Sequence, residues 1–199
     1  HYAVQGLSEL GPKVAVSELT ALTSNRRLFP AVSTFLGKIG TEKAFLGLLK
    51  ALENDEPAAR KYAIEEIGKF NSELAIPNLI HVLNHDKDFS VRTKAVYVLG
   101  ELGKEEVVPA LIEALDQRHH SVYLAAAVAL MKFEPEISLS RLQTALLDKE
   151  VEVRESVITA LKGIEAEQRY PLLVKALEDK EPHIRCRAIH ELGEIGSKG

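Results

Sequence analysis

Hydrophobic residues between Val91 and Asp116 follow two stripes with helical spacing. The first stripe consists of Val91, Ala95, Leu99 and Leu102. The second stripe consists of Val108, Leu111, Ile112 and Leu115. Each set lies on one face of an α-helix, because its members are three or four residues apart. Gly103 stands where a glycine can end the first helix, and Pro109 lies in the first turns of the second. The pattern predicts a helix hairpin.

Approximate copies of this pattern recur with a period of about 32 residues. The frame returns as Ala63, Ile67, Phe70, Pro77, Leu79 and Leu83, as Ala126, Leu130, Phe133, Leu142 and Leu146, and as Val157, Leu161, Ile164, Pro171, Leu173 and Leu177. Partial copies are Val32, Leu36, Ile39, Leu48 and Leu52, and Ala188, Leu192 and Ile195. One hairpin cannot bury both of its stripes alone, so neighbouring hairpins must stack. We therefore expect an all-α, right-handed α-solenoid of about six and a half repeats, forming a single array over residues 1–199.

The two ends of the array are less regular. Residues 1–25 hold an incomplete unit, and Asn25 is the expected N-cap of the next helix, which Pro30 should kink or delay. The chain begins with His1 and ends just after a seventh first helix, so we interpret it as a fragment of a longer polypeptide. Neither end carries a polar capping helix. Apolar ends of this kind should promote self-association.

Three short motifs carry a family resemblance. They are Val91-Arg92, the helix end Leu99-Gly-x-Leu-Gly103, and Pro109-x-Leu111-x-x-x-Leu115. The repeat unit resembles the HEAT family, above all the compact HEAT-like variant found in subunits of cyanobacterial phycobilin lyases and in bacterial scaffold proteins. This resemblance implies the fold, whereas such repeats serve unrelated functions.

A charged pair also repeats. Asp86 precedes Arg92 by six residues, and the same spacing recurs as Asp148 with Arg154, Asp179 with Arg185, and, with an amide, Asn54 with Arg60. We expect a structural ladder of charge-assisted hydrogen bonds between the aspartate of each turn and the arginine of the following helix. As exposed pairs these would contribute about 0.5 kcal/mol each and set the register of the repeats. Gln117 and Tyr123 replace both partners in one repeat, which favours a structural role over a binding role.

Composition excludes several classes of protein. The 199 residues are 46% hydrophobic and 27% charged, as in ordinary soluble domains. The net charge of -4 would repel nucleic acid, so a nucleic-acid partner is not expected. A single cysteine, Cys186, leaves no internal disulfide and suits the cytoplasm. No apolar run is long enough for membrane insertion.

Candidate chemistry is sparse. His81 and His85 lie four residues apart, a spacing that suits a metal, but two ligands do not make a site. His119-His120 fit a turn and a helix cap. No histidine is placed to activate Cys186, because His190 has no third group to orient it. We therefore predict no catalytic residue, no metal site and no cofactor.

A partner surface is expected on the second helices, which line the concave side of a solenoid. One column of positions holds Ser17, Gly47, Asn78, Ala110, Arg141 and Leu172, and the next holds Thr20, Lys50, His81, Glu113, Thr144 and Lys175. The columns mix charges of both signs and lack a basic stripe with aromatic residues, which favours a protein or peptide over nucleic acid. The alternative is a face that is merely solvated.

The stretch from Val122 to Met131, VYLAAAVALM, contains no charged residue. Leu124 and Val128 stand where the other repeats have mostly polar residues, and Tyr123 replaces the ladder arginine. With Tyr97 of the preceding repeat, these residues predict a hydrophobic contact on the convex side. The alternative is an alanine-rich helix that exposes little apolar area.

These observations favour a non-catalytic scaffold that binds another protein. The resemblance implies one alternative, a bilin-lyase-like subunit that attaches or detaches a tetrapyrrole on a phycobiliprotein. A second alternative is a regulatory repeat domain of a larger enzyme or transporter.

Overall fold

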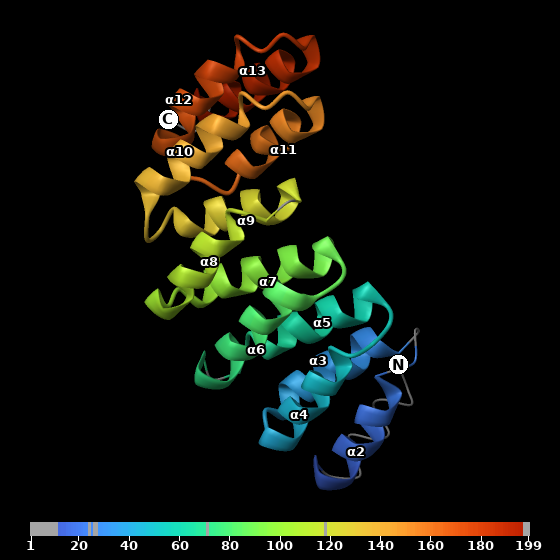
Figure 1. The fold of residues 1–199 in the computed structure, drawn as a ribbon. Helices are drawn as coiled ribbons and strands as arrows, with labels where there is room; N and C mark the ends of the chain where they lie inside the picture. Colours follow the sequence, from blue (N-terminus) through green and yellow to red (C-terminus); the bar gives the residue numbers. More distant parts are fainter. Residues whose placement is uncertain (1–11, 24, 26–27, 71, 118, 197–199) are drawn as a thin grey trace. The chain divides into compact units, whose positions relative to one another are not determined.

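A computed structural model describes residues 12–23, 25, 28–70, 72–117 and 119–196 (Figure 1). All regular secondary structure in these ranges is helical, which confirms the all-α class. The chain falls into two compact units, divided between Val107 and Val108. This division lies between the two helices of the repeat that spans residues 91–116.

The first unit contains six α-helices and one 3-10 helix among its described residues. They are α2 (Pro12–Leu22), α3 (Phe29–Ile39), α4 (Glu42–Ala51), α5 (Pro57–Ile67), α6 (Ser72–His85), α7 (Phe89–Leu102) and η1 (Glu105–Val107). Helices α3, α5 and α7 pack on one another in succession, while α4 lies against α3 and α5, and α6 lies against α7 (Figure 1). The first helices of successive hairpins therefore form one layer.

The second unit repeats this arrangement with six α-helices in its described part. They are α8 (Val108–Ala114), α9 (His120–Leu130), α10 (Pro135–Ala145), α11 (Val151–Leu161), α12 (Ala166–Ala176) and α13 (Pro182–Gly196). Helices α9, α11 and α13 form the layer of first helices, α8 and α10 pack on α9, and α12 packs on α11 and α13. Stacked helix hairpins of this kind are the α-solenoid class that the sequence predicts.

The predicted stripes form the core. The stripe residues with no more than 1% exposure include Leu36, Ile67, Leu99, Leu130 and Leu161 of the first helices, and Leu48, Leu79, Leu111, Leu142 and Leu173 of the second helices. Full burial of one such side chain contributes about 1.5–3 kcal/mol. The repeating frame of apolar residues is thus confirmed as the source of the core.

Helix ends follow the predicted signals with one correction. Gly103 ends α7 with φ 64°, in the left-handed conformation that glycine adopts without strain. Asp88 caps α7, since its side chain accepts a hydrogen bond from the amide of Ser90. Asn25 does not cap α3. That helix begins at Phe29 after Leu28, because Pro30 has to lie in the first turn, where its missing N–H costs least.

The expected convex contact on α9 is wrong for Leu124, which is only 3% exposed. Lys61, Thr93 and Glu155, which occupy the same position in other repeats, are half-buried, so this column faces neighbouring structure and an apolar residue there becomes covered. Val128 is half-buried, and its Cγ1 lies 3.2 Å from where a Cβ on Gly163 would stand. Both apolar residues therefore pack inward.

The structure describes the two ends of the repeat array only in part. The first-helix part of the incomplete first unit falls on residues 1–11, which lie outside the described residues, and its second helix is α2. At the other end Ala188 is buried and Leu192 and Ile195 are half-buried, so self-association stays a prediction. In the described part of the chain, no helix has both the length and the apolar character needed to cross a bilayer.

Candidate functional site

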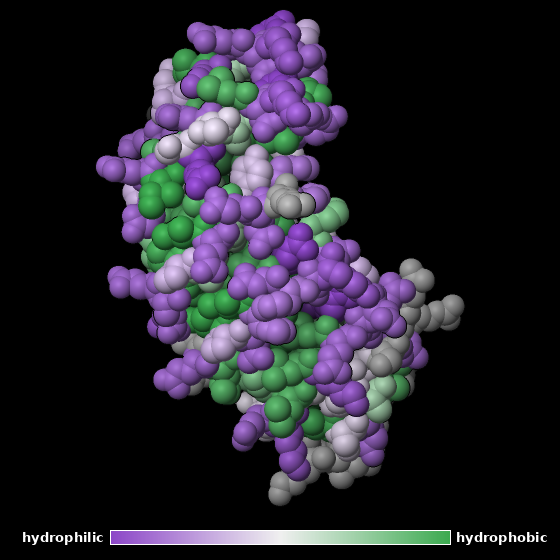
Figure 2. All heavy atoms as spheres, in the orientation of Figure 1, coloured by the Kyte–Doolittle hydropathy of each residue, from purple (hydrophilic) through white to green (hydrophobic). Residues whose placement is uncertain are grey.

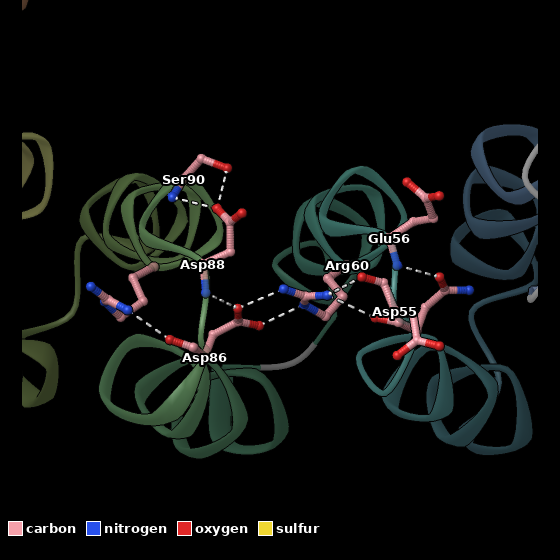
Figure 3. A network of polar contacts seen from close by, with 8 residues as sticks. Asp55, Glu56, Arg60, Asp86, Asp88 and Ser90 are labelled. Atoms are coloured by element: carbon pink, nitrogen blue, oxygen red, sulfur yellow. Dashed lines mark hydrogen bonds and ion pairs between the residues drawn. The ribbon is translucent and has the colours of Figure 1, made fainter.

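The repeated charged residues form a buried network (Figure 3). Arg60 of α5 donates from Nε to Oδ2 of Asp86 at 2.7 Å and from Nη2 to Oδ1 at 2.8 Å. Its Nη1 donates to the backbone oxygens of Asn54 at 2.8 Å and Asp55 at 3.1 Å. The side chains of Arg60 and Asp86 are only 4% and 9% exposed. One arginine thus joins two successive turns between repeats.

A second copy of this network lies in the other unit. Arg154 donates from Nε to Oδ2 of Asp179 at 2.7 Å and from Nη2 to Oδ1 at 3.1 Å, and its Nη1 donates to the backbone oxygen of Asp148 at 2.9 Å. The hydrogen bond from Arg154 lowers the pKa of Asp179, while burial of the carboxyl acts in the opposite direction. The two copies share one geometry.

The observed ladder differs from the expected one in register and exposure. Asp86 and Asp179 each pair with the arginine of the preceding repeat, which stands 26 residues before Asp86 and 25 residues before Asp179. The arginine six residues after it, Arg92, donates to the Asp86 backbone oxygen at 2.7 Å instead. The expectation of exposed pairs is wrong, because each turn folds the carboxylate back to accept the amide two residues on, as Asp86 does from Asp88 at 2.9 Å.

The observed register also changes the interpretation of the interrupted repeat. Tyr123 stands where an arginine would reach Asp148, and by sequence position Gln117 stands where an aspartate would follow Arg92. The two substitutions therefore do not compensate each other. Arg92 keeps a buried Nε with no hydrogen-bond partner among the described residues. The carboxylate of Asp148 forms no ion pair with a described lysine or arginine, although Arg154 lies near enough for its charge to interact.

Two grooves open near the C-terminal ends of the second helices, one in each unit. The α4–α6 groove has a volume of about 370 Å³ and is lined by Leu49, Leu52, Glu53, Asn78, His81, Val82, His85 and Asp86. The α8–α10 groove has a volume of about 260 Å³ and is lined by Leu115, Gln117, Tyr123, Arg141, Thr144, Ala145 and Asp148. They occupy corresponding places in the repeat.

Hydrogen-bonding side chains and apolar walls combine in the α4–α6 groove. The rings of His81 and His85 stack with their centroids 4.4 Å apart, and His85 Nδ1 lies 3.0 Å from the backbone oxygen of His81. Asn78 donates to the backbone oxygen of Leu74 at 2.9 Å. Imidazole nitrogens can donate to a carboxylate. No group of three histidine, cysteine, aspartate or glutamate side chains in the described residues could hold a metal ion.

The structure distributes the predicted partner-binding residues unevenly. Asn78 and His81 line the α4–α6 groove, and Tyr123, Arg141 and Thr144 line the α8–α10 groove. Of the other predicted partner-binding residues, those that are exposed but line neither groove are Lys50, Glu113, Lys175 and Tyr97.

One expected column is only partly a surface. Its small and apolar members, Gly47, Ala110 and Leu172, are buried. They pack into the core instead of facing solvent, so a partner could reach only the polar members of that column.

The prediction missed exposed apolar residues on the second helices. Leu46 on α4 is 57% exposed, Leu74 on α6 is 46% exposed, and Tyr170 on α12 is 53% exposed. Figure 2 shows apolar patches interrupted by polar side chains on the face that it draws. The sequence signal that could have identified them is an apolar residue at a helix position outside the core stripe.

Cys186 lines neither groove. It is exposed on α13. The thiol is therefore not part of the lining of either groove.

The curated relatives have names that refer to phycocyanin or to bilins. The chain is 22% identical to an uncharacterized phycocyanin operon protein Y of Pseudanabaena tenuis (strain PCC 7409), over 80% of this chain and 40% of that protein. It is 29% identical to the phycocyanobilin lyase subunit alpha of Nostoc sp. (strain PCC 7120), over 94% of this chain and 75% of that protein. The chain thus spans less than half of one relative and three quarters of the other.

A solved structure is similar along almost the whole chain. The complex of CpcE and CpcF of phycocyanin lyase from Nostoc sp. PCC7120 contains a chain with 27% identity and a TM-score of 0.57, matched over 94% of this chain and 77% of that one. The family model of HEAT repeats matches residues 45–132, 76–162 and 138–199. Because these matches together cover most of the sequence, the chain belongs to the HEAT-repeat family.

Proposed function

We propose that this chain is a HEAT-repeat subunit of a phycobilin lyase-type enzyme. In this role it binds a bilin and a phycobiliprotein polypeptide together with a second subunit. The observation that carries the proposal is the similarity to phycobilin lyase subunits along 94% of the chain, in both sequence and structure. The proposal replaces the general scaffold interpretation with a more specific binding role.

The α4–α6 groove supplies suitable chemistry for a bilin. A bilin is an open-chain tetrapyrrole with apolar rings and carboxylate side chains. Leu49, Leu52 and Val82 give the groove apolar walls, and His81 and His85 supply donors for carboxylates. Its volume of about 370 Å³ lies within the range of small-molecule sites.

Binding and orientation are the contributions that these side chains can make. The groove contains donors, acceptors and apolar walls, whereas the exposed thiol of Cys186 lies outside it. Holding two reactants in a productive geometry removes much of the entropic barrier of a bimolecular step. In this proposal the chain acts through positioning.

Substitution in a lyase assay tests the proposal. The full chain is mixed with CpcF, apo-phycocyanin and phycocyanobilin in place of CpcE, and covalently attached bilin is measured by visible absorbance after denaturation. We expect attachment above the level seen with CpcF alone. A complete CpcE–CpcF pair is the positive control. Attachment equal to the CpcF blank, with folded chain and an active control, contradicts the proposal.

A second candidate is protein binding without bilin transfer. The exposed Leu46, Leu74 and Tyr170 on the second helices favour it, because such residues contribute to protein interfaces. The same mixture separates the two candidates. Capture of apo-phycocyanin by the chain without any gain in attached bilin supports the second.

A further inference from the structure

We infer that the Asp148 end of the α8–α10 groove binds the guanidinium group of an arginine from a partner polypeptide. The inference does not depend on the proposed lyase role, because it rests on how this chain uses its own arginines. It assigns a ligand to the place where the internal ladder is interrupted.

Two of the turn aspartates already bind guanidinium groups through paired hydrogen bonds. Asp86 accepts both Nε and Nη2 of Arg60, and Asp179 accepts both Nε and Nη2 of Arg154. Such paired, parallel hydrogen bonds match the planar fork of arginine and are stronger than bonds between neutral groups. The repeat therefore contains a built guanidinium acceptor.

Asp148 is held in the same way as these two carboxylates. Its Oδ1 accepts the amide of Glu150 at 2.8 Å, as Oδ1 of Asp179 accepts the amide of Glu181 at 2.8 Å. Its orientation is thus fixed before any ligand arrives. No lysine or arginine of the described residues forms an ion pair with its carboxylate, because Tyr123 occupies the position of the ladder arginine. Arg154 donates to the Asp148 backbone oxygen and interacts with the carboxylate only through longer-range electrostatics.

The space left by the missing arginine is part of the α8–α10 groove. Tyr123 and Asp148 line it together, in a volume of about 260 Å³. Tyr123 is half-buried, and burial, followed by the nearby charge of Asp148, raises the pKa of its phenol. A neutral aromatic ring beside a carboxylate suits a guanidinium, which stacks on ring faces while its N–H groups reach the carboxylate.

The rim of the groove favours a polypeptide over a small molecule. Leu147 directly precedes Asp148 in the sequence and is 69% exposed, although it is not part of the groove lining, so an apolar side chain next to the incoming arginine could pack against it. Arg141 also lines the groove, and its Nη2 lies 3.3 Å from Oδ1 of Asp116, so its charge is partly offset. Thr144 and Gln117 add hydrogen-bonding groups for a peptide backbone.

A nuclear magnetic resonance titration tests the inference. The ¹⁵N-labelled full chain is titrated with N-acetyl-arginine amide, with N-acetyl-lysine amide as the matched cationic probe. We expect saturable shifts of the amide signals around Asp148 and Glu150, with at least about tenfold weaker binding of the lysine probe, because lysine lacks the bidentate fork. Equal binding of both probes contradicts a guanidinium site.

Three variants assign the response to the groove. Asp148→Asn should abolish the shifts, and Tyr123→Arg should abolish them by supplying the internal arginine. Glu152→Gln changes an exposed carboxylate on α11 and should leave them unchanged. Retention of binding in folded Asp148→Asn overturns the inference.

Two further arms identify the source of the guanidinium. Free arginine should bind no more tightly than the blocked form, and tighter binding of free arginine would indicate a small-molecule site and overturn the polypeptide assignment. Arg118 follows the lining residue Gln117 in the sequence and is tested as an internal source of the guanidinium. Arg118→Ala should bind the blocked form as the parent chain does. If Arg118→Ala binds N-acetyl-arginine amide and the parent chain does not, the Arg118 side chain occupies the groove of the parent chain and the inference is wrong.

Discussion

Arg60 and Asp86 form a bidentate ion pair that is almost completely buried, with distances of 2.7 Å and 2.8 Å. Asp86→Ala should lower the free energy of unfolding by about 3–5 kcal/mol, because it leaves a buried guanidinium without its partner. Urea denaturation followed by circular dichroism measures this. Asp116→Ala is the control, since its pair with Arg141 is exposed and should contribute less than about 1 kcal/mol. Equal small losses in both variants would contradict the structural role of the ladder.

The Arg154–Asp179 pair predicts a loss of stability in acid. The pKa of Asp179 is lowered in the folded chain, so its contribution is fully present above its unfolded value of about 3.9 and is lost as the pH falls through the lower folded value. Asp179→Asn removes this dependence. The stability gap between the parent chain and Asp179→Asn should therefore narrow as the pH is lowered from about 5 toward 2, measured by urea unfolding at each pH. A gap that is constant over this range would show that the carboxylate charge is not responsible.

Tyr123→Arg should extend the ladder in the interrupted repeat. The new guanidinium can reach the preorganised carboxylate of Asp148, with a gain of about 1 kcal/mol and a rise in Tm of roughly 2–4 °C for a chain of this size. Differential scanning calorimetry measures the shift. The gain should disappear when Asp148→Asn is added, which separates the ion pair from a general effect of arginine. A gain that persists in the double variant argues against pairing.

Two glycines at corresponding repeat positions should respond oppositely to alanine. A Cβ on Gly68 would stand 2.2 Å from Cγ1 of Val98, whereas a Cβ on Gly193 would meet nothing within 4 Å. Gly68→Ala should destabilise by about 1–3 kcal/mol through overpacking. Gly193→Ala should be neutral or stabilise by up to about 1 kcal/mol, because alanine is the better helix former. Thermal unfolding of both variants measures these changes in stability. A Gly68→Ala variant as stable as the parent chain would show that Val98 can move to make room for the added methyl group.

The fold was predictable because one apolar frame recurs along the chain. Ile67, Leu99 and Leu130 repeat at helical spacing, and all three are fully buried. The exact start of α3 was not predictable. The sequence offered Asn25 as a cap and indicated that Pro30 would kink or delay the helix, but it did not show that the helix begins at Phe29. Leu124 was misplaced for a related reason. Its polar counterparts suggested a solvent-facing column, yet long polar side chains can occupy half-buried positions that an apolar residue fills completely.

The ladder shows where sequence reasoning about the candidate site ends. The spacing between Asp86 and Arg92 is constant in the sequence, but it marks a contact between a guanidinium and a backbone oxygen. The carboxylate contact joins Asp86 to Arg60 across a repeat, which only the packing of successive helices defines. The two grooves were equally hidden, because their linings come from several elements. The sequence could place Asn78 and His81 on two neighbouring columns, but it did not show which residues enclose them.

The most direct test of the proposed function is covalent bilin attachment in the CpcF assay with groove variants. We expect the parent chain to support attachment and the double variant Asn78→Ala with His81→Ala to lose most of it, at unchanged Tm. His183→Ala, an exposed histidine outside both grooves, should keep the parent activity. Parent activity in the folded double variant would remove the α4–α6 groove from the account, and bilin attachment by the parent chain no higher than that of CpcF alone would contradict the lyase-type function itself.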